Sequence, residues 1–450
     1  MRTRRIRIIG GGLAGPEAAL QAAKRGCEVD LYEMRPTRST EAHQTSDFAE
    51  LVCSNSLKSE SENTAPWLLK QEMRRAGSIL LAEADATAVP AGHALAVDRV
   101  EFSKRVAARV AAETRITVHR EEVTCLKESD DALTILASGP LTSPALAAEL
   151  QRLTGSDHLA FYDSISPIVD ASTIDMNKVY FAARYDKGTA DYINCPFTKE
   201  EYDRFIEALT TAKAVEAKDW ERFPATGTAE KLQYFEGCLP IEETARRGSD
   251  TLRFGPMKPV GLTDPKTGKW PYAVVQLRQE NLRADSYNLV GFQNHLRYGE
   301  QNRVLKLIPG LENATFLRYG QIHRNTYIHA PSLLAETLQL KAHPGVMIAG
   351  QLSGVEGYTE SIASGMLAGI YAAAIANGQV PTPAPRLSAN GSLTHYITHS
   401  ETKKFQPANI TFDLLPPLEE ELRKKIRDKR ERHRIQCERA LAAWTSWLNS

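Results

Sequence analysis

The start of the chain alternates between short apolar segments and a stretch of small residues. Residues 6–9 and 28–32 are apolar enough to predict two short buried strands. Pro16 suits the first turn of a helix between them, and Gly26 is expected to end that helix. The alanines of the helix permit close packing on a sheet. The pattern therefore predicts a strand–helix–strand unit at the opening of an α/β fold.

The turn before this helix has the glycine spacing of a dinucleotide-binding site. Gly10, Gly12 and Gly15 form the pattern GxGxxG. Glu33 follows the second strand at about the spacing where an acidic side chain meets a ribose hydroxyl, which disfavours NADP. Glycines let the backbone approach a pyrophosphate; the alternative is a glycine-rich turn without a ligand. The cofactor-binding residues expected here are Gly10, Gly11, Gly12, Leu13, Ala14, Gly15 and Glu33.

Two later segments favour FAD over NAD. Residues 133–143 are an apolar strand that runs into a turn, and residues 346–374 are a strand, a glycine turn and a small-residue helix. A late strand that aims a helix N-terminus at the cofactor resembles the glutathione-reductase-type flavoproteins. Without this pairing, residues 346–374 would be one more strand–helix unit of the sheet. The additional cofactor-binding residues expected are Gly139, Gly350, Gln351 and Gly357.

Between these segments the pattern changes to that of a mixed α+β region. Residues 178–195 predict a hairpin, and the spacing of Thr198 and Glu201 predicts a capping box at the start of a helix. Residues 251–279 predict a second hairpin, and residues 211–231 are expected to form a charged surface excursion. The segment is therefore expected to be an insertion in the flavin domain.

The predicted organisation is a Rossmann-like, glutathione-reductase-type FAD-binding domain interrupted by this α+β insertion. The FAD-binding domain is expected over residues 1–165 and 336–450, and the insertion over residues 166–335. Residues 420–439 predict a long, predominantly basic helix. Such a helix is either an RNA-binding surface or a solvated charged face. The candidate RNA contacts are Arg423, Lys424, Lys425, Arg427, Lys429 and Arg430.

Composition adds limits to this picture. The 450 residues are 42% hydrophobic, which is ordinary for a globular protein of two or three domains. The 55 basic and 55 acidic side chains cancel, which argues against a uniformly basic surface but permits a local basic patch. No apolar run approaches the ~18 residues of a membrane span, and Arg7 interrupts the first run. We therefore expect a cytoplasmic protein without a membrane partner.

The six cysteines are scattered along the chain and are expected to be free thiols, and no metal site is expected. Cys53 stands in ELVCSNSLKS, between an apolar pair and a run of small polar residues. The residues alone favour a small buried filler over chemistry, because free cysteine often behaves as a small hydrophobe.

A series of long blocks identifies a family resemblance. GGGLAGPEAA, YEMRP, FAELVCSNSLKS, YFEGCLPIE, LRFGPMKPVGL, LVGFQNHLRYGEQ and AGQLSGVEGYTESIASG occur in this order. They resemble the folate- and FAD-dependent tRNA (uracil-5-)-methyltransferases, the TrmFO family, from Ile6 to beyond Gly365. The wobble-uridine flavoprotein GidA is a more distant relative that shares the flavin domain. Ser138 departs from an expected threonine but keeps the hydroxyl.

The resemblance implies a reaction. FAD would be reduced by NAD(P)H, 5,10-methylenetetrahydrofolate would supply a one-carbon unit, and the T-loop uridine of tRNA, position 54, would be methylated. The resemblance also implies that Cys53 and Cys238 are catalytic, one as the nucleophile and one as the base. Cys238 is the preferred nucleophile because Gly237 allows close approach of a ring. His295 is a candidate folate contact, since folate needs a flat ring against the flavin.

Three alternatives stay open at this point. The chain is a flavin-dependent oxidoreductase of a small molecule, an RNA-binding protein with structural FAD, or the same methyltransferase acting on a ribosomal RNA uridine. The first alternative gives no role to two cysteines in separate blocks.

Overall fold

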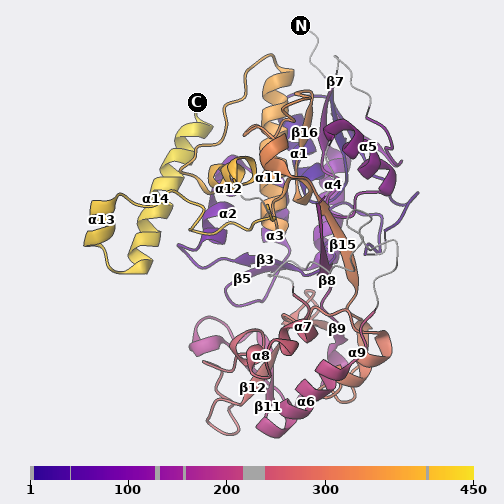
Figure 1. Ribbon diagram of the computed structural model, residues 1–450, viewed down its shortest axis with the longest axis vertical. Coiled ribbons are helices and arrows are strands. Elements are labelled where there is room, and N and C mark those ends of the chain that lie inside the picture. Colours follow the sequence, from indigo (N-terminus) through magenta and orange to yellow (C-terminus); the bar gives the residue numbers. More distant parts are fainter. Residues whose placement is uncertain (1–4, 41, 127–131, 156–158, 216–238, 402–404) are drawn as a thin grey trace.

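The computed structural model describes residues 5–40, 42–126, 132–155, 159–215, 239–401 and 405–450. Two lobes lie one above the other along the long axis (Figure 1). The upper lobe, which we call the FAD-binding lobe, has a hydrophobic core built from both ends of the chain. The lower lobe, which we call the insertion lobe, has a separate core from the middle of the chain. The division at residues 165 and 335 stays a prediction.

The FAD-binding lobe is built on a five-stranded sheet in the order β16-β7-β1-β2-β6, and every neighbouring pair is parallel. The late strand β16 therefore returns to lie beside β7, as the sequence predicted. This arrangement confirms the Rossmann-like fold class. The strands are β1 (Arg5–Ile9), β2 (Val29–Tyr32), β6 (Ile116–His119), β7 (Ala132–Leu136) and β16 (Val346–Ile348).

Small residues let two helices pack closely beside this sheet (Figure 1). These are α1 (Ala14–Lys24) and α11 (Tyr358–Ala376). A Cβ on Gly365 would lie 2.3 Å from the Ala14 carbonyl oxygen, and a Cβ on Gly369 would lie 2.5 Å from that of Ala18. By length and composition α11 is apolar enough to cross a membrane, but 83% of that window is buried in the lobe.

Further helices and a small sheet complete the FAD-binding lobe. The helices are α2 (Ala65–Ala76), α3 (Ile79–Ala86), α4 (Arg99–Ala112), α5 (Pro144–Thr154), α10 (Ala330–Leu333), α12 (Ala389–His399), α13 (Glu420–Lys425) and α14 (Lys429–Leu448). The small antiparallel sheet consists of β3 (Ser56–Ser59), β4 (Ala88–Val89) and β5 (Ala94–Val97).

The insertion lobe contains a six-stranded sheet in the order β10-β11-β12-β13-β9-β14, with antiparallel neighbours. Two long antiparallel strands, β8 (Leu159–Ser164) and β15 (Ile322–Tyr327), run between the lobes (Figure 1). The other elements are β9 (Ile168–Asp170), β10 (Tyr180–Ala182), β11 (Tyr192–Phe197), α6 (Lys199–Thr211), α7 (Ile241–Arg246), α8 (Thr251–Phe254), β12 (Ala273–Gln279), β13 (Ser286–Leu289), α9 (Tyr298–Leu305) and β14 (Phe316–Arg318).

The local predictions for this lobe succeed in part. The first hairpin is confirmed by β10 and β11, and Thr198 and Glu201 form the predicted capping box at α6. The predicted hairpin over residues 251–279 is wrong, because its first arm is α8 followed by turns. Pro256 and Pro259 in that arm lack the N–H groups that a paired strand needs. Residues 216–231 of the predicted excursion lie outside the described residues.

The long basic helix predicted over residues 420–439 is also wrong in one respect. The backbone of Ile426 is extended and ends α13. Asp428 then accepts a hydrogen bond from the Arg430 N–H at 3.0 Å and caps a new helix, α14. The basic segment is therefore two helices with a corner between them.

Candidate functional site

The glycine turn lies where the carboxyl ends of β1, β2 and β7 meet, between β1 and α1. A Cβ on Gly10 would lie 2.3 Å from the Ala137 carbonyl oxygen, and a Cβ on Gly15 would lie 1.8 Å from that of Gly10. Both glycines are therefore required by packing. A Cβ on Gly12 would have no heavy atom within 4 Å, so Gly12 borders open space. That space is where the backbone of such a turn approaches a pyrophosphate.

Glu33 holds the glycine turn from the end of β2. Its carboxylate accepts hydrogen bonds from the Gly11 N–H at 2.7 Å and from the backbone N–H and Nε of Arg35, both at 2.9 Å. Burial acts to raise the pKa of Glu33, but the hydrogen bonds and charge of Arg35 outweigh it and leave the pKa below its ordinary range. Glu33 is therefore an anion that orders the turn, and its ribose contact stays a prediction.

A cavity of about 40 Å³ lies at this end of the sheet, and Gly10 and Glu33 are among the residues that line it. Tyr32, Met34 and Thr142 also line it and were missed, since nothing in their spacing marks them. Gly139, in the turn after β7, has a φ of 69°, which favours glycine. The cavity lies at the carboxyl edge of the sheet, where a dinucleotide is expected to bind.

The turn after β16 meets the glycine turn. A Cβ on Gly350 would lie 3.0 Å from the Ala14 Cβ, so the starts of α1 and the returning segment are in contact. Gln351 donates a hydrogen bond to the Glu356 carboxylate at 2.6 Å, which ties the turn to the residues just before α11. Gly357, at the N-cap of α11, has a φ of 108°.

As far as the chain is described, the starts of α1 and α11 lack a side-chain cap. No described side chain caps either helix at its N-cap residue, Leu13 or Gly357. Uncapped N–H groups at a helix start, together with the helix dipole, favour the phosphates of a nucleotide. The two helix starts and the open space beside Gly12 are features expected of an FAD site.

Cys53 lies at the start of α11. Its backbone N–H donates to the Tyr358 hydroxyl oxygen at 2.8 Å, and the Ser54 N–H donates to the same oxygen at 3.3 Å. Burial raises the pKa of Tyr358, so its hydroxyl stays protonated. Cys53 itself is half-buried beside a small apolar cluster. Tyr358 was missed by the sequence analysis because it is 305 residues away along the chain.

Arg278, on β12 of the insertion lobe, reaches across to the Cys53 loop. Its Nη2 donates to Ser54 Oγ and its Nε donates to Asn55 Oδ1, both at 2.9 Å. The guanidinium is buried, and its described partners are neutral. It therefore brings a positive charge to the loop that contains Cys53.

Two more guanidinium groups flank the same loop. Arg99 on α4 donates to the Leu51 carbonyl oxygen at 3.0 Å and forms an ion pair with Glu280 at 2.6 Å. Burial lowers the pKa of Arg318 on β14, Arg99 lowers it further, and Cys53 acts in the opposite direction. Among the described residues, three guanidinium groups thus lie around the loop, with the carboxylates of Glu280 and Glu50 near them. Such a surplus of positive charge stabilises a thiolate.

Two predicted site residues remain, His295 and Cys238. His295 is buried, and its Nδ1 lies 2.9 Å from the Glu242 carboxylate, inside the insertion lobe. Its role in folate binding stays a prediction. Cys238 lies outside the described residues.

Other cysteines that the structure describes have no such setting. Cys27, Cys195 and Cys437 are buried, and burial raises the pKa of each thiol. Cys125 is exposed. These cysteines have the environments expected of packing or surface thiols.

The six candidate RNA contacts on α13, α14 and the corner between them are all exposed. Lys424 forms an ion pair with Glu420 at 2.7 Å. Within the described part of the chain, the other five form no ion pair; they are Arg423, Lys425, Arg427, Lys429 and Arg430. Figure 1 shows α13 at the periphery of the FAD-binding lobe. The positive charge of this tail is therefore available to a polyanion.

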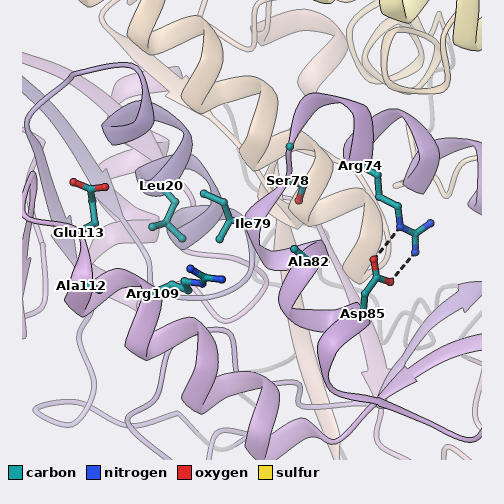
Figure 2. Close-up of a pocket in the computed structure, with 10 residues that line it drawn as sticks. Leu20, Arg74, Ser78, Ile79, Ala82, Asp85, Arg109, Ala112 and Glu113 are labelled. Atoms are coloured by element: carbon teal, nitrogen blue, oxygen red, sulfur yellow. Dashed lines mark hydrogen bonds and ion pairs between the residues drawn. The ribbon is translucent and has the colours of Figure 1, made fainter.

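A groove of about 530 Å³ beside α1, α3 and α4 is a weaker candidate (Figure 2). Its arginines already have partners: Arg74 binds Asp85 at 2.7 Å, and Arg109 binds Glu83 at 2.5 Å. None of the expected cofactor-binding or catalytic residues lines this groove. We assign it no part in the chemistry.

Comparisons with known proteins agree with this geometry. The family described as Glucose inhibited division protein A matches residues 5–380. The methylenetetrahydrofolate–tRNA-(uracil-5-)-methyltransferase TrmFO of Koribacter versatilis is 68% identical over 99% of this chain and 98% of the relative. The TrmFO of Enterococcus faecalis is 53% identical over 98% of this chain and 97% of the relative.

A solved structure is similar in fold. GidA from Aquifex aeolicus has a TM-score of 0.69 at 17% identity, over 99% of this chain and 74% of that chain. At this identity the similarity shows the fold alone.

Proposed function

The chain belongs to the GidA family and, within it, to the methylenetetrahydrofolate–tRNA-(uracil-5-)-methyltransferases, TrmFO, and we propose that it methylates carbon 5 of a tRNA uridine. Its cofactor is FAD, and its one-carbon donor is methylenetetrahydrofolate. The observation that carries the proposal is the position of Cys53, which lies at the start of α11 beside the turns that fit FAD. A small-molecule oxidoreductase needs no thiol there.

Uracil carbon 5 is a weak nucleophile, so the protein must activate it. A thiolate that adds to carbon 6 produces an enolate, and the enolate makes carbon 5 reactive. Carbon 5 then forms a bond to the one-carbon unit, whose bond to its donor breaks. A base removes the carbon-5 proton, and the thiolate leaves carbon 6. When bound, FAD supplies the two electrons that a methylene group needs to become a methyl group.

We assign the nucleophile to Cys238 and the base to Cys53. Gly237 precedes Cys238 and leaves room for a pyrimidine ring. Tyr358 fixes the backbone of Cys53, and the guanidinium group of Arg318 stabilises its thiolate. Cys53 then accepts the carbon-5 proton. His295 is our candidate for the folate contact.

The finer details of the reaction are also proposals. We place the target in the T loop, at position 54 of tRNA, and we take NAD(P)H as the reductant and the cytoplasm as the location. A stacked T-loop uridine must leave its stack to reach a site at the helix starts, so we infer base flipping. The exposed cations of α13 and α14 are suited to hold the phosphates around it.

The test is methylation of an unmodified tRNA transcript by the purified protein. We expect label from methylenetetrahydrofolate in 5-methyluridine, dependent on reduced nicotinamide, and none from S-adenosylmethionine. A transcript in which uridine 54 is replaced by cytidine is the matched control and should accept no label. Label from S-adenosylmethionine alone would show that methylenetetrahydrofolate is not the one-carbon donor. Flavin turnover on a small molecule with no RNA product would favour the oxidoreductase.

A further inference from the structure

Three metal-ligating side chains meet on the FAD-binding lobe, away from the glycine turns. Glu336 follows α10, and His395 and His399 lie one helical turn apart near the end of α12. The Glu336 carboxylate is 3.2 Å from His395 Nδ1 and 3.6 Å from His399 Nδ1. The two imidazole rings are stacked, with centroids 4.4 Å apart. Both ring nitrogens therefore face one carboxylate oxygen.

These separations suit a tetrahedral ion. Zinc bound to nitrogen and oxygen at about 2.0–2.1 Å keeps its ligand atoms about 3.4 Å apart. The two measured separations lie on either side of that value, and all the ligand atoms lie within 4.8 Å of one another. The three side chains are between 38% and 50% exposed, so water has access to the remaining coordination position.

One hydrogen bond competes with metal binding at His399, and its loss costs little. The Thr398 hydroxyl lies 2.9 Å from His399 Nδ1. The same hydroxyl donates to the Thr394 carbonyl oxygen at 2.8 Å, so it keeps a partner when a metal ion replaces it at the ring. Ion binding therefore leaves no buried polar group unsatisfied here.

We propose that Glu336, His395 and His399 form a zinc-binding site that clips the segment after α10 to α12. Two imidazoles and a carboxylate are a usual ligand set for this ion. Glu336 and His395 are 59 residues apart, so a bound ion closes a long loop of the folded chain. An ion that binds the folded state and not the unfolded state stabilises the fold. The proposal does not depend on methyl transfer.

The test uses the full-length protein, freed of any histidine tag, and Zn²⁺ in competition with a chromophoric chelator. We expect one zinc ion per chain and a melting temperature that rises with zinc concentration. His395→Ala and His399→Ala should each weaken binding by at least about tenfold. Glu336→Gln keeps the side-chain size and should also weaken it, which guards against a folding defect in the alanine variants.

Two controls separate this site from adventitious binding. His93→Ala removes an exposed histidine outside the cluster and should leave zinc affinity unchanged. Bound Co²⁺ should show no thiolate charge-transfer band, because the site contains no cysteine. Wild-type zinc affinity in the His395→Ala, His399→Ala double variant would overturn the proposal, as would the absence of one-to-one binding in the wild type.

Discussion

Gly12 and Gly15 belong to one GxGxxG turn but have different surroundings. Gly12→Ala adds a Cβ that meets no protein atom, in a backbone conformation open to other residues. We expect this variant to fold and to bind FAD at least about tenfold more weakly, because the methyl group occupies the space assigned to the pyrophosphate. Gly15→Ala places its Cβ 1.8 Å from the Gly10 carbonyl oxygen and should destabilise the fold by about 1–3 kcal/mol.

Flavin titration and urea denaturation of both variants check this difference. Equal loss of stability in the two variants would mean that Gly12 is also a packing residue. Wild-type flavin affinity in Gly12→Ala would show that the pyrophosphate does not bind beside Gly12.

The two proposed catalytic cysteines are separable with RNA that contains 5-fluorouracil in the T loop. Fluorine at carbon 5 prevents proton removal, so the nucleophile stays attached to carbon 6. We expect Cys53→Ala and Cys238→Ala each to abolish methyl transfer while FAD stays bound. Cys53→Ala should still form the adduct and Cys238→Ala should not, as measured by mass spectrometry.

Cys125→Ala is the matched control for these variants, since this thiol is exposed and outside the site. An adduct on Cys53 would exchange the two roles. Full activity in both active-site variants would return Cys53 to a packing role.

At the scale of elements, the junction between α2 and α12 predicts a dependence of stability on pH. The Glu72 carboxylate on α2 accepts hydrogen bonds from the Ala389 and Asn390 N–H groups at the start of α12, at 2.7 and 2.9 Å. Burial raises the pKa of Glu72 to about 7 despite these bonds. In the unfolded chain the group titrates near 4.5.

The direction of this pH dependence is set by which state, folded or unfolded, binds the Glu72 proton more tightly. Between about pH 4.5 and pH 7 the folded state holds the Glu72 proton more tightly than the unfolded state. The contribution of Glu72 to the free energy of unfolding is therefore complete at low pH and declines as pH rises. We expect it to contribute up to about 3 kcal/mol across this window. Urea denaturation at several pH values should show a slope in the wild type that Glu72→Gln reduces. Glu62→Gln, at an exposed carboxylate, is the control, and an unchanged slope in Glu72→Gln would contradict the prediction.

At the scale of the whole molecule, a chain with no net charge concentrates free cations on its carboxyl-terminal helices. We expect the triple variant Lys425→Gln, Arg427→Gln, Arg430→Gln to bind tRNA more weakly. The slope of the logarithm of the binding constant against the logarithm of the salt concentration should become shallower by up to about 3. The reason is that each lost phosphate contact releases about one counterion fewer. Filter binding at several salt concentrations measures both effects, and FAD content should not change.

Arg434→Gln is the matched control, because Arg434 already pairs with Glu431 and Glu438 on α14. It should alter binding little. Wild-type affinity and salt dependence in the triple variant would mean that α13 and α14 are only a solvated face.

The sequence by itself determined the features that depend on near neighbours. The β1–α1–β2 unit, the capping box at Thr198 and the turn at Gly139 follow from residues a few positions apart, because helix, strand and turn preferences are local. The matching blocks also indicated the family, since their order along the chain is itself a property of the sequence.

Only the tertiary structure decided which residues far apart in the sequence are in contact. Tyr358 fixes Cys53 from 305 residues away, Arg278 reaches Asn55 from 223 residues away, and Glu336 meets His395 across 59 residues. Hydrophobic periodicity reports which face of an element is buried, but not which element covers it. The first arm of the second predicted hairpin failed for a local reason, its two prolines, and β12 pairs with β11 and β13. The proposed chemistry at Cys53 therefore rests on long-range contacts, and those of Arg278 and Arg318 form only where the two lobes pack together.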